Sequence, residues 1–391
     1  MYDLARSSGR CEDRTGEPGG FIDGLEQQNL DGRLGFADRS RIVLGRTATG
    51  ALRRLLLGRL TGLSVGLVAV CTYFALAEPT FMTWPNWQNI IRAEAVAAIL
   101  AIGMTFVLLT GGIDLSVASM TAGAGMVLGL ALEHGWAWPL ALLACIGVGT
   151  GMGFANGFLI GPARIPFFVV TLGTLGIYQS FARLVTPGSQ TIALFGVTTF
   201  TRLGELTNGT VGPLPNVLVL VIVLYLLGTV MLRYSKFGYS IFAVGSNPQA
   251  ARLTGVRVNA VLASVYTTSG LLAAIAATVR TGQSSAATPD ADPTLMLTVA
   301  AAVLIGGTAF TGGDGGLLGT ALGIVFLGVI QNGLLLTNVS QFWQGTVSGV
   351  ILILAVGFGV LRDYGLRLRQ RRIVITRRRD RSGSPRRLTP H

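Results

Sequence analysis

Asp114 and Ser116 are the residues whose types and spacing best suit chemistry, and they lie in the tract TGGIDLS at Thr110–Ser116. A carboxylate placed just before a helix can cap it by accepting hydrogen bonds from its first backbone N–H groups. A carboxylate among apolar segments can equally bind a hydroxyl group of a polar solute, because ionisable groups at membrane depth usually serve function. The sequence leaves both roles open, a structural cap and a ligand contact.

Glycines precede Asp114 and recur in a second tract, IGGTAFTGGDGG, at Ile305–Gly316. Glycine weakens a helix, and irregular backbone within a membrane is tolerated only where it is buried in protein or lines a water-filled cavity. We therefore expect broken or tightly turned helices at both tracts. The glycines concerned are Gly111, Gly112, Gly306, Gly307, Gly312 and Gly313.

A phosphate-binding loop is the competing explanation of the second tract, and the sequence argues against it. No GxxxxGK[ST] motif occurs in the sequence, and Lys236 is its only lysine. The 3 cysteines and 2 histidines are too widely spaced to suggest a disulfide framework, a zinc site or a Ser-His-Asp triad. The chain is therefore predicted to hold no metal or cofactor of its own and to be no enzyme, in particular no ATPase.

Amide and hydroxyl side chains also lie inside apolar segments, at Asn156, Thr171 and Asn332. Each can form an interhelical hydrogen bond, worth roughly 0.6 kcal/mol on average in a membrane. Such groups on facing helices can also contact a polar solute during its passage. For any single one of these residues, the interhelical bond is the simpler interpretation.

Composition shows that membrane helices must position these residues. Of the 391 residues, 50% are hydrophobic and 12% are charged, and the mean hydropathy is +0.60, which excludes an ordinary soluble domain. We predict an all-α polytopic membrane protein with about ten transmembrane helices and glycine-rich breaks. The expected spans are 55–77, 88–110, 115–133, 137–160, 166–186, 215–232, 259–281, 295–311, 316–337 and 343–361.

The distribution of charge predicts three parts and an orientation. Residues 1–54 form a flexible tail, 55–361 the transmembrane domain, and 362–391 an Arg-rich tail. An even number of spans places both tails and the basic loops on one side, which the positive-inside rule assigns to the cytoplasm. The net charge of +12 lies in tails and loops, so we expect contact with anionic membrane lipid and none with nucleic acid.

One polar stretch, Gly238–Val258, separates two spans and reads GYSIFAVGSNPQAARLTGVRV. Asn247 and Pro248 predict a break, residues 249–253 favour a helix, and Gly255 predicts its end. The stretch is thus a turn, a short helix and a turn, exposed to water and able to dock on a soluble protein. A plain solvated connector is the alternative interpretation.

This stretch resembles the coupling loop of permease subunits of bacterial ABC importers for monosaccharides of the ribose, xylose and arabinose type. That loop has the pattern G...A.GxNPxAAxxxGV. TGGIDLS resembles the first motif of the same family, and IGGTAFTGGDGG resembles its second, GGTSxxGGxG. The three motifs occur in the family's order, and the resemblance runs from about Phe81 to Leu361.

The resemblance implies a permease that carries a monosaccharide across the cytoplasmic membrane of a bacterium. It implies a separate ATP-binding cassette subunit that binds the ATP, a permease dimer, and an extracytoplasmic sugar-binding protein. The longest outer connector, 187–214, is a candidate docking surface for that protein, although a plain loop is the simpler interpretation. We expect Ala251 to be a small-residue contact with the ATPase. The residues that match the coupling pattern are Gly238, Asn247, Pro248, Ala250, Ala251, Arg252 and Gly255.

The sequence departs from the family at Met296 and Thr298, where sugar permeases commonly carry acidic residues. It does not identify the sugar. One alternative is a permease for another small solute, such as amino acids, in a related ABC importer. Another is a secondary sugar carrier, which needs membrane-embedded carboxylates for ion coupling, whereas the predicted spans offer almost none besides Asp114.

Overall fold

The computed structural model describes residues 59–340 and, beyond them, residues 343, 345–347, 349, 350, 353 and 357. The predicted tails at 1–54 and 362–391 lie outside the described residues, as does most of the predicted span at 343–361.

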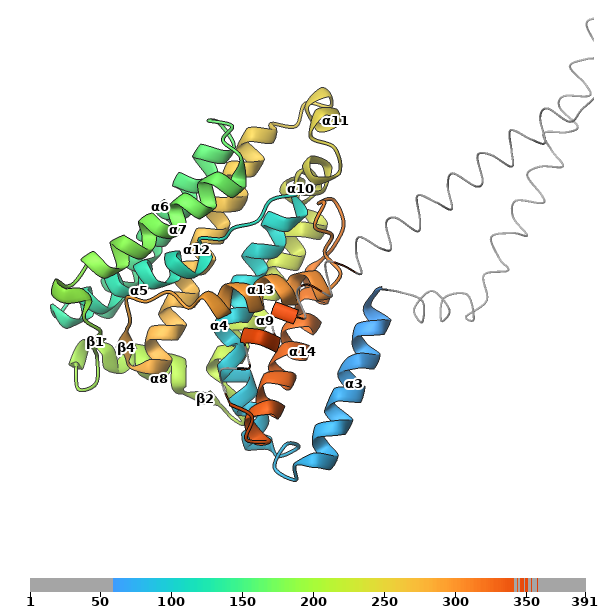
Figure 1. Cartoon of the computed structure of the whole chain (residues 1–391). Coiled ribbons are helices and arrows are strands. Elements are labelled where there is room, and N and C mark those ends of the chain that lie inside the picture. The colour runs from blue at the N-terminus through green and yellow to red at the C-terminus, as the bar shows by residue number, and fades with distance from the viewer. Residues whose placement is uncertain are drawn as a thin grey trace, which may run out of the picture. The chain divides into compact units, whose positions relative to one another are not determined.

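Each of the first nine predicted spans corresponds to one helix of the structure (Figure 1). Most bounds agree within a few residues, but α13 ends at Ile305, before the predicted residue 311, because the glycine-rich tract begins there. The helices are α3 (Arg59–Ala77), α4 (Trp84–Leu109), α5 (Val117–Glu133), α6 (Trp138–Ile160), α7 (Phe167–Leu184), α9 (Asn216–Tyr234), α12 (Val258–Ser284), α13 (Pro293–Ile305) and α14 (Leu317–Leu336).

Among the described residues, 6 helices are long and apolar enough to cross a membrane: α4, α6, α7, α9, α12 and α14. Helices α5 and α13 are apolar but shorter, as is the segment Thr61–Ala77 of α3. The predicted number of about ten spanning helices is therefore not confirmed, whereas a multi-pass membrane protein is. Two of the short helices adjoin the glycine-rich tracts, since α5 follows the first and α13 precedes the second.

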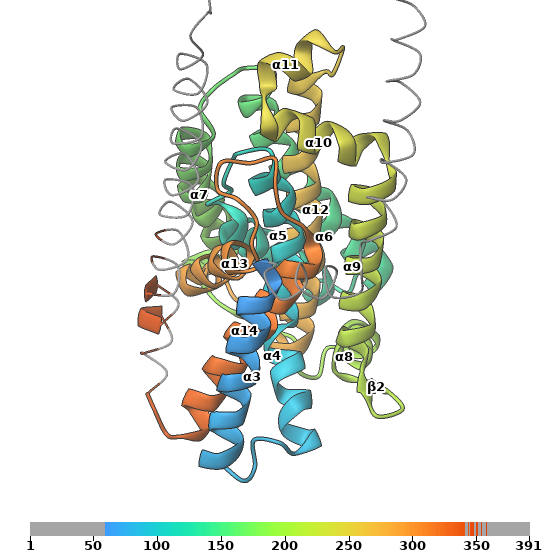
Figure 2. The same ribbon diagram turned by 90° about the vertical axis from the view of Figure 1, so that its right-hand side faces the viewer.

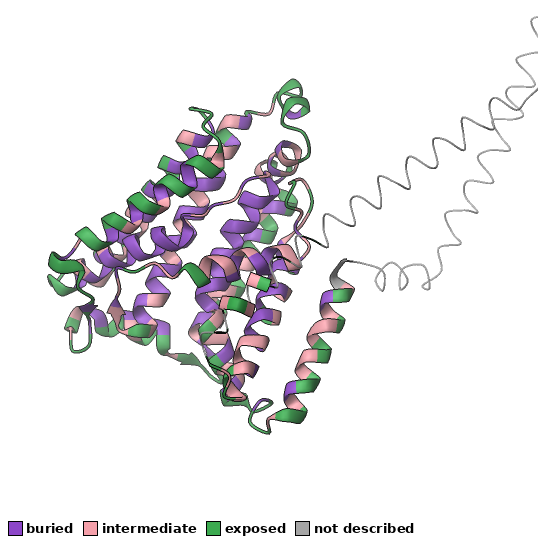
Figure 3. Cartoon of the chain, in the orientation of Figure 1, coloured by how far each residue is buried: buried purple, intermediate pink, exposed green. Residues whose placement is uncertain are grey.

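Helix α4 lies in the interior of the helix bundle. In its most apolar stretch, 83% of the residues are buried, against 17% in the corresponding stretch of α9. Figure 3 shows the buried residues concentrated on α4 and on the helices that pack on it. The exposed apolar side chains of α6, α7 and α9 lie on the outside, where contact with lipid suits them.

Helix α6 packs on α12 through small residues repeated every fourth position. A Cβ at Gly153 or Gly157 would collide with the backbone of α12, at Tyr266 and Ala263 respectively. Without side chains on this face the two backbones approach closely, and close approach maximises van der Waals contact between membrane helices. The small residues of this face are Ala141, Cys145, Gly149, Gly153, Gly157 and Gly161.

Short elements lie at the two ends of the bundle (Figures 1 and 2). At the end that we call the α11 end are α10 (Lys236–Ser246) and α11 (Pro248–Leu253). At the opposite end, the β end, the connector from α7 to α9 holds two 3-10 turns, η1 (Pro187–Ser189) and η2 (Thr198–Phe200), and the helix α8 (Thr201–Asn208).

The β end also carries two small sheets, within a chain that is otherwise mostly helical, as predicted. Strand β1 (Ile192–Ala193) pairs with β4 (Ala286–Ala287), and β2 (Thr210–Val211) pairs with β3 (Leu214–Pro215). Both pairs are antiparallel and two residues long. Runs this short leave no alternating pattern in a sequence, which is why hydropathy does not reveal them.

Candidate functional site

The polar stretch between α9 and α12 contains two helices, because α10 precedes the predicted one. Oγ of Ser235 caps α10 by accepting a 3.0 Å hydrogen bond from the N–H of Gly238. Gly238 is buried, and a Cβ there would collide with the backbone of Leu232 in α9. This glycine therefore lets α10 fold closely onto the end of α9. The sequence signal for α10 is a set of apolar residues spaced as on one helix face. They are Phe237, Ile241 and Val244.

Helix α11 begins where the sequence predicts it. Oδ1 of Asn247 accepts hydrogen bonds from the N–H groups of Gln249 and Ala250, both at 3.0 Å, and Pro248 is the first helical residue. Gly255 follows the helix with φ +86°, a conformation that glycine adopts without the steric cost paid by other residues. The cap and the terminating glycine make α11 a short helix with both ends fixed.

The exposed face of α11 does not include Ala251, contrary to the expectation from the sequence. Ala251 is 4% exposed and packs against its own chain, so it cannot make the small-residue contact with another subunit that we expected. Leu253 is instead 91% exposed at the end of the helix. A six-residue helix has too few turns to show from sequence which side faces inward. The exposed residues of α11 are Pro248, Gln249, Ala250, Arg252 and Leu253.

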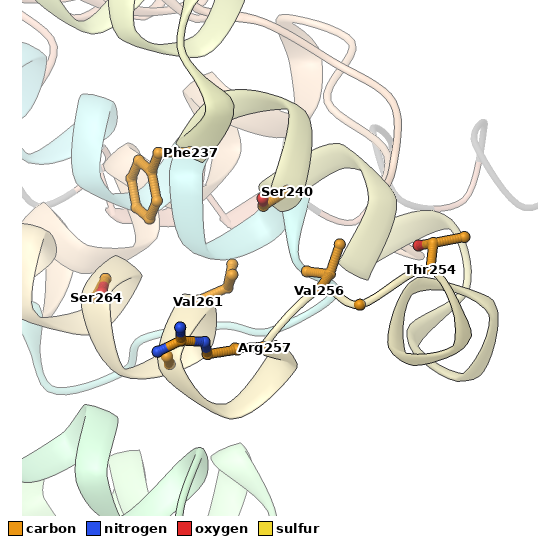
Figure 4. Close-up of a pocket in the computed structure, with 9 residues that line it drawn as sticks. Phe237, Ser240, Thr254, Val256, Arg257, Val261 and Ser264 are labelled. Carbon is orange, nitrogen blue, oxygen red and sulfur yellow. The ribbon is translucent and has the colours of Figure 1, made fainter.

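An open hollow of about 420 Å³ lies beside α11, between α10 and the first turns of α12. Figure 4 shows Phe237 and Ser240 of α10 on one side of it, and Arg257 and Val261 on the other. Its lining combines an aromatic ring, hydroxyl groups and one guanidinium group. The hollow and the exposed side of α11 together form a surface against which a protein side chain can pack.

The α11 end of the bundle contains a junction of three backbone segments. The N–H of Gly313 donates a 2.9 Å hydrogen bond to the carbonyl oxygen of Leu109, the last residue of α4. Gly245, in the last turn of α10, lies against both, because a Cβ there would overlap the Leu109 carbonyl and lie 2.5 Å from the Gly313 nitrogen. The first motif, the second motif and the polar stretch therefore meet at one point.

The predicted helix breaks lie at or next to this junction. Gly111 has φ +82° and ends α4, and a Cβ at Gly312 would lie 2.8 Å from its nitrogen. Gly112 is packed against Tyr266, whose hydroxyl would lie 2.5 Å from a Cβ at this position. Gly306 packs on the backbone of α14, while Gly307 continues the turn after α13. A side chain would therefore collide with a neighbouring backbone at Gly306 and Gly312 and with the Tyr266 hydroxyl at Gly112, whereas Gly111 and Gly307 serve the turns through their positive φ.

Asp114 is fully buried, and its carboxylate contacts protein groups. Oδ1 accepts hydrogen bonds from the N–H and the Oγ of Ser116, at 3.0 and 2.6 Å, and Oδ2 accepts one from Oγ of Ser269 in α12, at 3.0 Å. Ser116 is the N-cap residue of α5, but its side chain makes no capping bond. Asp114 therefore fixes the turn before α5 and ties it to α12, instead of capping the first turn of the helix.

The network continues from Ser116 into two more helices. Nδ2 of Asn156 in α6 donates a 2.8 Å hydrogen bond to Oγ of Ser116. The Tyr178 hydroxyl of α7 lies 3.1 Å from Oδ1 of Asn156 and 2.8 Å from the carbonyl oxygen of Met152, both of which accept. One buried polar network thus joins α6, α7 and α12 to the TGGIDLS tract, and removing a member leaves buried partners unpaired.

Thr171 and Asn332 do not join that network. The Thr171 hydroxyl bonds the Phe167 carbonyl of its own helix, 2.9 Å away. The Asn332 amide forms two reciprocal hydrogen bonds with Asn86 of α4, at 2.9 and 3.0 Å. Asn332 therefore makes an interhelical contact, and Thr171 an intrahelical one.

The chain is similar to known permeases over most of its length. Residues 86–356 match the family described as the branched-chain amino acid transport system / permease component. The chain is 32% identical over 292 residues to the ribose import permease protein RbsC of Bacillus subtilis (strain 168), which covers 75% of this chain and 90% of that protein. It is 33% identical over 296 residues to RbsC of Escherichia coli (strain K12), covering 75% and 91%.

A third relative is named for a different substrate. It is the autoinducer 2 import system permease protein LsrC of Yersinia enterocolitica serotype O:8 / biotype 1B, which is 32% identical over 290 residues, or 73% of this chain and 79% of that protein. The matched region contains both glycine-rich tracts and the polar stretch with α10 and α11. The chain is a member of the family of branched-chain amino acid transport system / permease components.

Proposed function

We propose that this chain is the membrane-spanning subunit of an ATP-driven importer that carries a monosaccharide, a pentose or a similar sugar, into a bacterial cell. Two of the relatives are named ribose import permeases and the third an autoinducer 2 import permease. Their similarity over about three quarters of the chain supports a sugar over the amino acids that the family description names. No phosphate-binding motif is present in the sequence, so ATP is bound by a separate partner subunit.

The main structural support for this proposal is the exposed side of α11. Leu253, at 91% exposure, presents an apolar side chain beyond the helix bundle, next to the hollow between α10 and α12. Apolar side chains that enter a pocket on a partner are typical of the central residues of an interface. The ATP-binding subunit docks here, and α11 is its coupling helix.

The junction at Gly245 transmits movement of that subunit. Helix α11 follows α10 through the single residue Asn247, and the last turn of α10 touches the end of α4 and the Gly312–Gly313 turn. A displacement of α11 therefore acts on α4 at one side and on the connector between α13 and α14 at the other. Close-packed backbones move together, because no flexible side chain lies between them.

Charge supports an orientation with the α11 end in the cytoplasm. The basic residues near this end are Arg164, Arg233, Lys236, Arg252 and Arg257. Short loops rich in Arg and Lys remain on the cytoplasmic side. Cysteines introduced at Gly209, at the β end, and at Gly255 test this orientation, since only the first is expected to react with an impermeant reagent added outside cells. Both termini are cytoplasmic in this proposal.

The complete importer contains two permease subunits, two ATP-binding subunits and an extracytoplasmic sugar-binding protein that docks at the β end, all in the cytoplasmic membrane and its lipid. The permease itself binds no cofactor. Two alternative functions are each supported by one observation. The family description names amino acids, which supports amino acid import. The carboxylate of Glu94 lies within α4, which supports ion-coupled sugar transport.

Reconstitution in lipid vesicles with the cognate ATP-binding subunit and sugar-binding protein tests the function. We expect uptake of labelled ribose or another pentose. This uptake requires ATP on the side of the membrane that the α11 end faces, whichever way the permease is inserted in the vesicle. Uptake of leucine and of no monosaccharide would establish the amino acid alternative. Sugar uptake without the ATP-binding subunit, driven by a proton gradient, would establish a secondary carrier.

A further inference from the structure

Glu94 is a carboxylate within the interior helix α4, and the network around Asp114 does not include it. It lies roughly 15 Å along the helix from Trp84, on the half of α4 nearer the β end. An ionisable group within a membrane helix is costly and faces the bundle interior or a water-filled path, where it marks the route of a substrate or ion. Its position therefore calls for a function.

Gly328 of α14 has no side chain and so leaves space for this carboxylate. A Cβ at Gly328 would lie 2.5 Å from Cγ of Glu94, 3.0 Å from Cδ and 3.2 Å from Oε1. The bare backbone of α14 thus lies against one side of the Glu94 side chain. Any other residue at this position would push the carboxylate away, so the pair Glu94 and Gly328 acts as one structural unit.

Other polar side chains lie at the same level of α14. Gln331, one turn after Gly328, has its Nε2 3.5 Å from Oγ1 of Thr298 in α13. On the next residue, the Asn332 amide pairs with Asn86 of α4. Gln331 and Thr298 thus link α14 to α13 one turn from Gly328, and the asparagine pair links α14 to α4 nearer the β end.

Glu94 is more accessible than the residues one turn before and after it on α4. Glu94 is half-buried, whereas Ile90 and Ala98, one turn before and after it on the same side of the helix, are 5% and 6% exposed. The side chain of Glu94 lies against α14 at Gly328, so at least this part of it faces another helix and not the lipid.

We propose that Glu94, in the space that Gly328 leaves on α14, forms a contact site for a neutral, hydroxylated solute on its way through the permease. The two oxygens of a carboxylate can accept hydrogen bonds from two adjacent hydroxyl groups, so Glu94 fits vicinal hydroxyls. A cationic solute would also suit a carboxylate, and the uptake assay distinguishes the two classes. The inference deepens the proposed import of a sugar and rests on it for the class of solute.

Thiol labelling tests whether Glu94 lines the path, independently of the solute. Glu94→Cys is made in a chain whose Cys11, Cys71 and Cys145 are replaced by alanine, and is assembled with both partner subunits in vesicles. A charged, water-soluble methanethiosulfonate is expected to modify it, at a rate that changes when the importer is trapped with ATP. Ile90→Cys is the matched control and is expected to stay unmodified. Equal, negligible labelling of both cysteines in either state would refute the proposal.

Uptake by Glu94→Gln tests the contact with the solute. Hydrogen bonds to a charged group contribute more than neutral ones, so we expect the maximal rate of labelled ribose uptake to fall about tenfold or more at saturating sugar-binding protein. Gly328→Ala is expected to cause a similar loss by displacing the carboxylate. Gly151→Ala is the control, because Gly151 is a helical glycine with nothing within 4 Å of its Cβ position.

The outcomes separate this inference from the proposed function. Wild-type uptake of pentoses that Glu94→Gln leaves unchanged would overturn the site and preserve the function. Absence of monosaccharide uptake by the wild type would overturn the function and the hydroxylated class, while the labelling result still decides whether Glu94 lines the path. If the wild type takes up a cationic solute and Glu94→Gln abolishes that uptake, the solute class is cationic and not neutral and hydroxylated.

Discussion

Gly313 donates its N–H to the carbonyl oxygen of Leu109 at 2.9 Å, which joins the second glycine-rich tract to the end of α4. The carbonyl of a terminal helical residue lacks an intrahelical partner, so this bond also satisfies a group that would otherwise need water. Gly245 lies over the same pair. A helix end, a turn and the short helix α10 are thereby held as one body at the α11 end of the bundle.

Substitution of Gly245 is expected to disrupt this junction. In Gly245→Ala the added methyl group overlaps the Leu109 carbonyl and must displace α10 or the Gly313 turn, and such overpacking typically costs about 1 to 3 kcal/mol. We expect a lower thermal midpoint in detergent and loss of coupled sugar uptake. Gly151→Ala, in the exposed part of α6, is the control and is expected to be neutral or slightly stabilising. Equal midpoints and equal uptake for the two variants would show that the junction tolerates a side chain.

Asp114 is expected to act through hydrogen bonds more than through charge. Asp114→Asn keeps an oxygen for Ser116, and the Ser269 hydroxyl can rotate to accept from the new amide group. Asp114→Ala leaves buried donors unpaired, at about 1 to 3 kcal/mol each. We expect substantial uptake and near-normal expression for Asp114→Asn, and loss of expression or activity for Asp114→Ala. An inactive but folded Asp114→Asn protein would show that transport uses the charge itself.

The turn after α11 is expected to depend on its positive φ. Gly255 has φ +86° and nothing within 4 Å of its Cβ position, so a side chain there meets backbone strain without a collision. A left-handed conformation costs most residues roughly 1 to 2 kcal/mol, and asparagine tolerates it best. Gly255→Val is expected to reduce the ATP hydrolysis stimulated by loaded sugar-binding protein, and Gly255→Asn to retain it. Full activity of Gly255→Val would mean that the turn can be remodelled freely.

Hydropathy predicts the long helices because each crossing of a membrane requires a continuous apolar run, and the structure has a helix at each of the first nine predicted places. The helix α10 is missed because Gly238 and Gly245 suggest a turn, whereas both serve as points of close backbone contact. A single sequence does not distinguish a glycine in a flexible turn from a glycine at a tight packing contact.

The meeting of Leu109, Gly245 and Gly313 lies beyond prediction from one sequence. These residues are far apart along the chain, and their contact leaves no periodic pattern, since it is made by backbone atoms. The same holds for Glu94: its charge is visible in the sequence, but the facing Gly328 is brought to it by the packing of α14 on α4.

The docking of the ATP-binding subunit on α11 is tested most directly by Leu253→Glu. Leu253 is 91% exposed, so the substitution leaves the permease folded, but a carboxylate at the centre of an interface loses its hydration and can cost several kcal/mol. Phe195→Glu is the matched control, because Phe195 is also 91% exposed and lies in the connector between α7 and α9 at the β end.

The measurement is co-purification of the tagged permease with its cognate ATP-binding subunit from detergent-solubilised membranes. The proposed function predicts that Phe195→Glu retains the subunit at the wild-type ratio and that Leu253→Glu loses it, with an affinity reduced on the order of a hundredfold. Retention of the ATP-binding subunit by Leu253→Glu at the wild-type ratio would contradict the assignment of α11 as the coupling helix.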